Sequence, residues 1–93
     1  VKLANGHLVI AFNNSYTQRN PLSVALSTDE GRTWTRVRNI EADDHGSYSY
    51  PAIIQDRNGI IHLTYTWNRE SIKHAAFNEA WILQGQEKFA EKQ

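Results

Sequence analysis

The sequence predicts an all-β fold of repeated antiparallel strands, because two hairpin patterns recur in it and short apolar runs alternate with polar residues. Each pattern places an Asn-Gly pair between two runs of β-branched and aromatic residues, the strongest short-range signal for a tight hairpin turn. The pairs are Asn5-Gly6 and Asn58-Gly59. A length of 93 residues with 40% apolar content is enough for one small folded domain.

The two hairpins belong to an internal repeat, since Asn58 follows Asn5 by 53 residues. A further apolar segment follows each hairpin, at residues 21–27 and 71–77, so the predicted unit is strand, Asn-Gly turn, strand, loop, strand. A period of about 50 residues with three or four antiparallel strands is typical of β-propeller blades. Overlaying the units aligns Leu8 with Ile61, Ile10 with Leu63, and Phe12 with Tyr65.

The repeat divides residues 1–93, a single partial propeller domain, into two blade-like units and a tail. The units cover about residues 1–47 and 48–81, and the tail covers 82–93. Residues 78–93 suit a short terminal helix, because Trp81 and other apolar residues stand among Glu, Gln, Lys and Ala. Three arrangements fit this organisation: a piece of a longer protein, three copies closing a six-bladed ring, or two units packed as a small sandwich.

The segment between the strands predicted around residues 21–27 and 35–38 carries the most specific motif. Asp29 can accept backbone N–H bonds across a turn, Gly31 can take a positive φ, and Trp34 can bury its ring under the hairpin. The motif is Ser-x-Asp-x-Gly-x-Thr-Trp, with fixed positions Ser27, Asp29, Gly31, Thr33 and Trp34.

This motif is the Asp box, or BNR repeat, and through it the chain resembles the sialidase (neuraminidase) superfamily of β-propellers. The resemblance runs from about Leu3 to about Trp81 and is strongest to the C-terminal part of predicted bacterial neuraminidase-like proteins. It implies about two blades of a six-bladed sialidase-type propeller. In that family the box is a structural turn on the rim, away from the substrate, so Asp29 is not expected to be catalytic.

The resemblance also implies a candidate nucleophile. Active sialidases open a strand shortly after the last Asp box with Tyr-Ser, and the tyrosine attacks the sugar; Tyr48-Ser49 stands in the matching place. A tyrosine suits sialic acid, whose own carboxylate would repel a carboxylate nucleophile. A phenol needs a neighbouring base, usually a glutamate, and Glu41 is the nearest glutamate upstream. In the family this glutamate comes from an earlier blade, so we expect it outside this chain.

Two further residues are candidates for binding the substrate. Arg19 lies in a loop that could face the centre of a propeller, where a guanidinium fork can hold the sugar carboxylate by two bonds. Trp67 ends a strand where the loops converge, and its ring could stack on a sugar face. The other two clamp arginines and the acid/base Asp of the family lie in earlier blades. Inter-blade packing for Tyr48 and Trp67, and a solvated loop for Arg19, are the structural alternatives.

Charge and residue usage weigh against several classes of partner and cofactor. Ten basic and ten acidic residues leave a formal charge of zero, which gives no field to attract nucleic acid or an anionic membrane. Cysteine is absent, and no two of the four histidines stand at a metal-ligand spacing, so we expect no metal and no cofactor.

The sequence therefore predicts a sialidase-like glycoside hydrolase domain, or its C-terminal fragment, with a glycan as ligand. A non-catalytic carbohydrate-binding propeller or a self-associating β module is the alternative. Because most of the family's catalytic set is expected in other blades, we expect the chain alone to be inactive. Its partner would then be the rest of a longer chain or further copies of itself.

Overall fold

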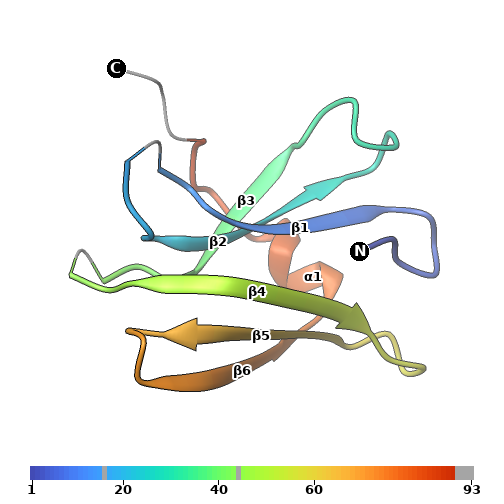
Figure 1. Ribbon diagram of the computed structural model, residues 1–93. Helices are drawn as coiled ribbons and strands as arrows, with labels where there is room; N and C mark the ends of the chain where they lie inside the picture. Colours follow the sequence, from blue (N-terminus) through green and yellow to red (C-terminus); the bar gives the residue numbers. More distant parts are fainter. Residues whose placement is uncertain (16, 44, 90–93) are drawn as a thin grey trace.

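The computed structural model describes residues 1–15, 17–43 and 45–89, and in them the chain forms two three-stranded antiparallel sheets and a short helix (Figure 1). The all-β prediction is confirmed. The first sheet has the order β1-β2-β3 and the second the order β4-β5-β6. The elements are β1 (Leu8–Asn13), β2 (Leu22–Ser27), β3 (Arg36–Glu41), β4 (Tyr48–Gln55), β5 (Ile61–Trp67), β6 (Ser71–Phe77) and α1 (Glu79–Leu83).

Both Asn-Gly turns form, although the strand predicted before the first does not. Gly6 and Gly59 take φ values of +92° and +84°, which only glycine adopts without strain. In the second turn, Asp56 Oδ1 accepts bonds from the backbone N–H groups of Asn58 and Ile60. Before the first turn, pairing is limited to an isolated bridge between Lys2 and Leu8.

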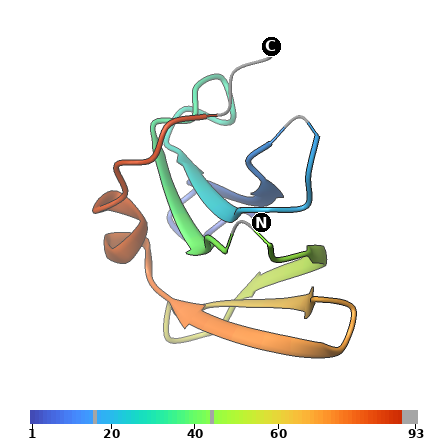
Figure 2. The same ribbon diagram turned by 90° about the vertical axis from the view of Figure 1, so that its left-hand side faces the viewer.

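The two sheets pack face to face, closest along β1 and β4, and diverge toward β3 and β6 (Figure 2). α1 lies on this open side, against β2 and β3, and its Ile82 is fully buried. Strand residues pointing between the sheets form the core, as the alternation predicts. The buried core cluster comprises Leu3, Val9, Leu22, Val24, Leu26, Tyr48, Ile61, Leu63, Tyr65, Phe77 and Ile82.

The repeat relates the sheets as successive members of a series rather than as two halves of a symmetric sandwich. In β5, Ile61, Leu63 and Tyr65 face the core. Their equivalents in β1 are Leu8, Ile10 and Phe12, which lie on the outer face of the first sheet, opposite the buried Val9. The two sheets therefore contact each other through non-equivalent faces: the face of the first sheet that carries Val9 packs on the face of the second sheet that carries Ile61, Leu63 and Tyr65. This head-to-tail relation between the faces is the one expected of consecutive blades.

The predicted terminal helix exists but is confined to one short segment. Asn78 caps it, because its Oδ1 accepts a 2.9 Å bond from the Trp81 N–H. Beyond Leu83 the chain follows the edge of β3, where Glu87 N donates to Val37 O over 3.1 Å. Gly85 sits so close to Val37 O that a Cβ would lie 2.4 Å from it, so the approach needs glycine.

The first sheet lies within residues 1–47 and the second within residues 48–81, while α1 runs from Glu79 to Leu83, across the boundary expected after residue 81. The last part of the predicted tail, residues 90–93, lies outside the described residues. Within the described part of the chain, no helix has the length and apolar character needed to cross a bilayer.

Candidate functional site

Antiparallel pairing sends the connections of both sheets to two opposite ends of the molecule (Figure 1). The loop end, on the left of Figure 1, contains the β1–β2 loop, the β3–β4 loop and the β5–β6 turn. The Asp-box end, on the right, contains the β2–β3 and β4–β5 connections. The predicted structural motif and the predicted substrate residues therefore lie at opposite ends.

The Asp-box turn is held by a compact set of local hydrogen bonds. Ser27 Oγ donates to Asp29 Oδ1 and accepts from Gly31 N, both over 2.8 Å. Thr33 bonds Asp29 through its backbone N–H, at 2.8 Å, and through its hydroxyl. These bonds from Thr33 and the one from Ser27 lower the pKa of Asp29 to about 2. Trp34 is partly buried and lines a hollow with Ile10 on the outer face of the first sheet.

The three residues predicted to act on substrate, Arg19, Tyr48 and Trp67, come together at the loop end although they stand far apart in the sequence. Tyr48 N donates to Arg19 O over 2.9 Å, and Tyr48 pairs with Trp67 across β4 and β5. Arg19 is exposed and Trp67 is partly buried. Their roles in binding a sugar stay predictions.

Asparagine side chains join the loops at this end, a feature that the sequence analysis missed. Asn20 Nδ2 donates to Gly46 O over 2.7 Å in a buried position, and Asn13 Nδ2 donates to Tyr48 O over 3.1 Å. Asn68 Oδ1 accepts from Ser47 N over 2.8 Å, while Asn68 N donates to Ser47 O over 2.7 Å. The sequence shows that these loops are rich in asparagine. It does not show which groups the asparagine side chains bind, because those partners depend on how the two sheets meet.

Tyr48 itself points into the core rather than toward solvent. It is 1% exposed, and its ring packs edge-on against Tyr65 with centroids 6.2 Å apart. Its hydroxyl lies where a Cβ on residue 46 would be, so Gly46 leaves the space for it. Burial, and then the negative charges of Glu41 and Asp43, raise the pKa of Tyr48. In this conformation the phenol is neutral and shielded, and a nucleophilic role stays a prediction.

Glu41 has a tyrosine partner, but that partner is Tyr65. The Tyr65 hydroxyl donates to Glu41 Oε2 over 2.7 Å, and Lys73 Nζ lies 3.7 Å from the same oxygen. Lys73 also stands 4.4 Å from the centroid of the Trp67 ring. Burial first, and then the hydrogen bond to Glu41 and its charge, raise the pKa of Tyr65. The cluster joins β3 of one sheet to β5 and β6 of the other, so sequence spacing gave no sign of it.

Tyr50 is the exposed tyrosine next to the predicted nucleophile. A bulge interrupts the β4–β5 register between Ser49 and Ala52, and Tyr50 within it has φ +51° and is 79% exposed. A non-glycine residue with positive φ is costly and is concentrated at functional positions. In a regular strand, Tyr48 and Tyr50 would point to the same face. The bulge separates them, so Tyr48 points inward and Tyr50 points to solvent.

A cluster of two histidines and an aspartate lies away from the loop end. On the outer face of the second sheet, His62 Nδ1 lies 2.8 Å from His74 Nε2, and His62 Nε2 lies 2.8 Å from Asp56 Oδ2. The hydrogen bond from His62 is the main cause that lowers the pKa of Asp56. The described residues include no cluster of three or more His, Asp or Glu side chains that could hold a metal ion.

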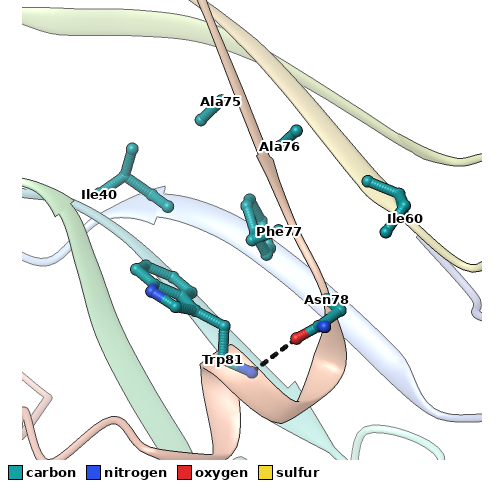
Figure 3. A pocket seen from close by; sticks show the side chains of 7 residues that line it. All are labelled: Ile40, Ile60, Ala75, Ala76, Phe77, Asn78 and Trp81. Carbon is teal, nitrogen blue, oxygen red and sulfur yellow. Dashed lines mark hydrogen bonds between the residues drawn. The ribbon is translucent and has the colours of Figure 1, made fainter.

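An apolar hollow of about 560 Å³ opens between the two sheets beside α1 (Figure 3). The rings of Phe77 and Trp81 line it side by side, and the Trp81 N–H donates to Asn78 Oδ1 at the start of α1. None of the predicted substrate residues lines it. Its lining residues are Ile40, Ile60, Ala75, Ala76, Phe77, Asn78 and Trp81.

Comparison with known proteins supports the Asp-box assignment. A family model described as a BNR repeat-like domain matches residues 1–63. That stretch includes the first sheet, the complete Asp box and β4. Searches of curated proteins and of solved structures gave no match. The family match covers more than half of the chain, and the two successive all-β units agree with it: the chain belongs to the BNR repeat-like family.

Proposed function

We propose that this chain supplies two blades of a sialidase-type glycoside hydrolase and that its loop end faces the glycan. The observation that carries the proposal is the convergence of Arg19, Tyr48 and Trp67 at one end, opposite the Asp box. An exposed guanidinium can bind a sugar carboxylate by two parallel bonds, and an indole can stack on the apolar face of a sugar ring. Residues of both kinds stand beside the tyrosine pair of β4.

The position of Tyr48 favours a second candidate, a glycan-binding propeller without catalysis. A phenol must lose its proton to attack an anomeric carbon, and burial together with nearby carboxylates opposes that loss. Tyr50 is exposed and presents its ring at the same end. In this candidate, Tyr50 and Trp67 act as stacking surfaces and Arg19 as the anion contact.

Binding is tested by titrating the chain with a sialylated trisaccharide while tryptophan fluorescence is recorded. We expect Arg19→Ala to weaken binding at least tenfold, since a bidentate charged contact is worth about 1.5–3 kcal/mol. Arg57→Ala is the matched control, because it removes the same charge from the exposed β4–β5 turn at the Asp-box end. Equal affinity of the parent chain and Arg19→Ala would contradict the proposed orientation.

Catalysis is tested separately with a fluorogenic sialoside. We expect no turnover by the chain alone, because it carries neither the full arginine clamp nor an assigned acid/base residue. Hydrolysis by the pure chain that Tyr48→Phe abolishes and Tyr50→Phe leaves intact would contradict that expectation and assign the nucleophile to Tyr48. Glycan binding without hydrolysis, weakened by Tyr50→Ala, would support the non-catalytic candidate.

A further inference from the structure

The outer face of the second sheet has the composition of a contact surface. We call it the β5 face; it is formed by outward residues of β4, β5 and β6. Ile54 is 63% exposed and Ile72 is 77% exposed. In an antiparallel sheet with one face in water, the residues that point outward are ordinarily polar or charged. Asp56 lines the same hollow as five of its residues and is bonded to His62. The six residues of the β5 face themselves include no charged Lys, Arg, Asp or Glu: Ala52, Ile54, His62, Thr64, Ile72 and His74.

The internal repeat indicates what such a face contacts. His62 and Thr64 occupy the positions of Val9 and Ala11 in the first unit. Val9 is 1% exposed and belongs to the core cluster against which Ala11 also packs. The β5 face is therefore the second-unit counterpart of a surface that, in the first unit, is covered by the next sheet.

The opposite outer surface has the complementary character. We call it the β1 face; it contains Leu8, Ile10 and Phe12, the counterparts of core residues Ile61, Leu63 and Tyr65. Ile10 is 43% exposed. With Phe12, Trp34 and Phe89, Ile10 lines an apolar hollow of about 170 Å³, in which the rings of Phe12 and Phe89 stack 5.6 Å apart.

His62 and Asp56 are already hydrogen-bonded on this side of the sheet, so these two side chains can be covered without losing their partners. His62 uses one ring nitrogen on Asp56 and the other on His74, each over 2.8 Å. Asp56 also accepts two backbone bonds from its own turn. Burial of a polar side chain is tolerated when its hydrogen bonds are already made.

We propose that the β5 face of one copy of this chain docks on the β1 face of a second copy, repeating the contact between its own two sheets. Such a contact is heterologous, so each copy keeps one free face until the assembly closes. Three copies of two sheets each would close a six-sheet ring. This interaction requires no glycan and stands apart from the function proposed for the loop end.

Sedimentation equilibrium of the purified chain tests the proposal. We expect a mass three times the 10.7 kDa of the chain. Ile72→Lys on the β5 face and Ile10→Lys on the β1 face should each abolish the trimer, because each would bury a charge in the contact. Leu83→Lys is the matched control, since Leu83 is 47% exposed on α1 and belongs to neither face. Circular dichroism and thermal unfolding verify that each variant remains folded.

Mixing the two face variants tests the head-to-tail arrangement. Ile72→Lys keeps an intact β1 face and Ile10→Lys keeps an intact β5 face, so the mixture should form a one-to-one heterodimer while each variant alone is monomeric. A monomeric parent chain, a trimer that survives Ile72→Lys, or a mixture without heterodimer would overturn the proposal. The same fall in mass in folded Leu83→Lys would also overturn it.

Discussion

The Asp-box turn and the loop end are held by opposite kinds of interaction. At the Asp-box end, Ser27, Asp29 and Thr33 bond to partners no more than four residues away. At the loop end, Asn13, Asn20 and Asn68 bond to partners 21 to 35 residues away. Long-range contacts form only after the entropy of loop closure has been overcome. The Asp-box turn should therefore tolerate weakening of the sheet contact, while the loop end should be lost with it.

The largest expected effect is that of Tyr48→Ala at the loop end. Removing a buried aromatic ring leaves a cavity and should lower the free energy of unfolding by about 3–5 kcal/mol. Trp34→Ala at the Asp-box end should cost less, because that ring is only partly buried. Urea unfolding followed by circular dichroism gives both values. A greater loss for Trp34→Ala would reverse the proposed difference between the ends.

Gly46→Ala tests how tightly the loop end is packed. The new methyl group would lie 2.1 Å from the Tyr48 hydroxyl and 2.3 Å from its ring carbon Cζ. Overpacking of this kind costs about 1–3 kcal/mol. In a Tyr48→Phe background the cost should fall, since the hydroxyl is absent, and a double-mutant cycle of urea unfolding measures the difference. Strictly additive losses would mean that Gly46 and Tyr48 do not compete for this space.

Asn20→Ala tests the hydrogen bond that joins the β1–β2 and β3–β4 loops. Its loss deprives the Gly46 carbonyl of the amide donor, which should cost about 1–2 kcal/mol. Asn58→Ala in the exposed β4–β5 turn is the matched control at the Asp-box end. Amide hydrogen exchange should show faster exchange of the loop-end amides Tyr48 and Asn68 in Asn20→Ala alone. Equal exchange in both variants would show that Asn20 does not hold this end together.

The same contrast explains which features the sequence predicts. The Asn-Gly turns and the Asp box are contiguous, and their chemistry is complete within a few residues, so both could be predicted. The resemblance to the sialidase superfamily singled out Arg19, Tyr48 and Trp67, and their roles rest on that resemblance rather than on a spacing in the sequence. The pair of Tyr65 and Glu41 depends on how the sheets face each other. The inward direction of Tyr48 depends on local packing and the bulge that separates it from Tyr50. Neither the Tyr65–Glu41 hydrogen bond nor the direction of the Tyr48 side chain follows from a periodic pattern or a residue spacing, so neither could be predicted from one sequence.

The smallest effect is a pH dependence confined to the Asp-box end. The folded pKa of Asp29 is about 2, below its usual value of 3.8, chiefly because the Thr33 hydroxyl bonds the ionised carboxylate. A depressed pKa adds stability that is fully present above pH 3.8 and is lost as the pH falls through about 2. We therefore expect the difference in unfolding free energy between the parent chain and Asp29→Asn to shrink across that interval, as urea titrations at successive pH values would measure. Thr33→Ala should raise the pKa of Asp29 and move the loss to higher pH. A difference that stayed constant down to pH 2 would mean that ionisation of the Asp29 carboxyl does not stabilise the turn.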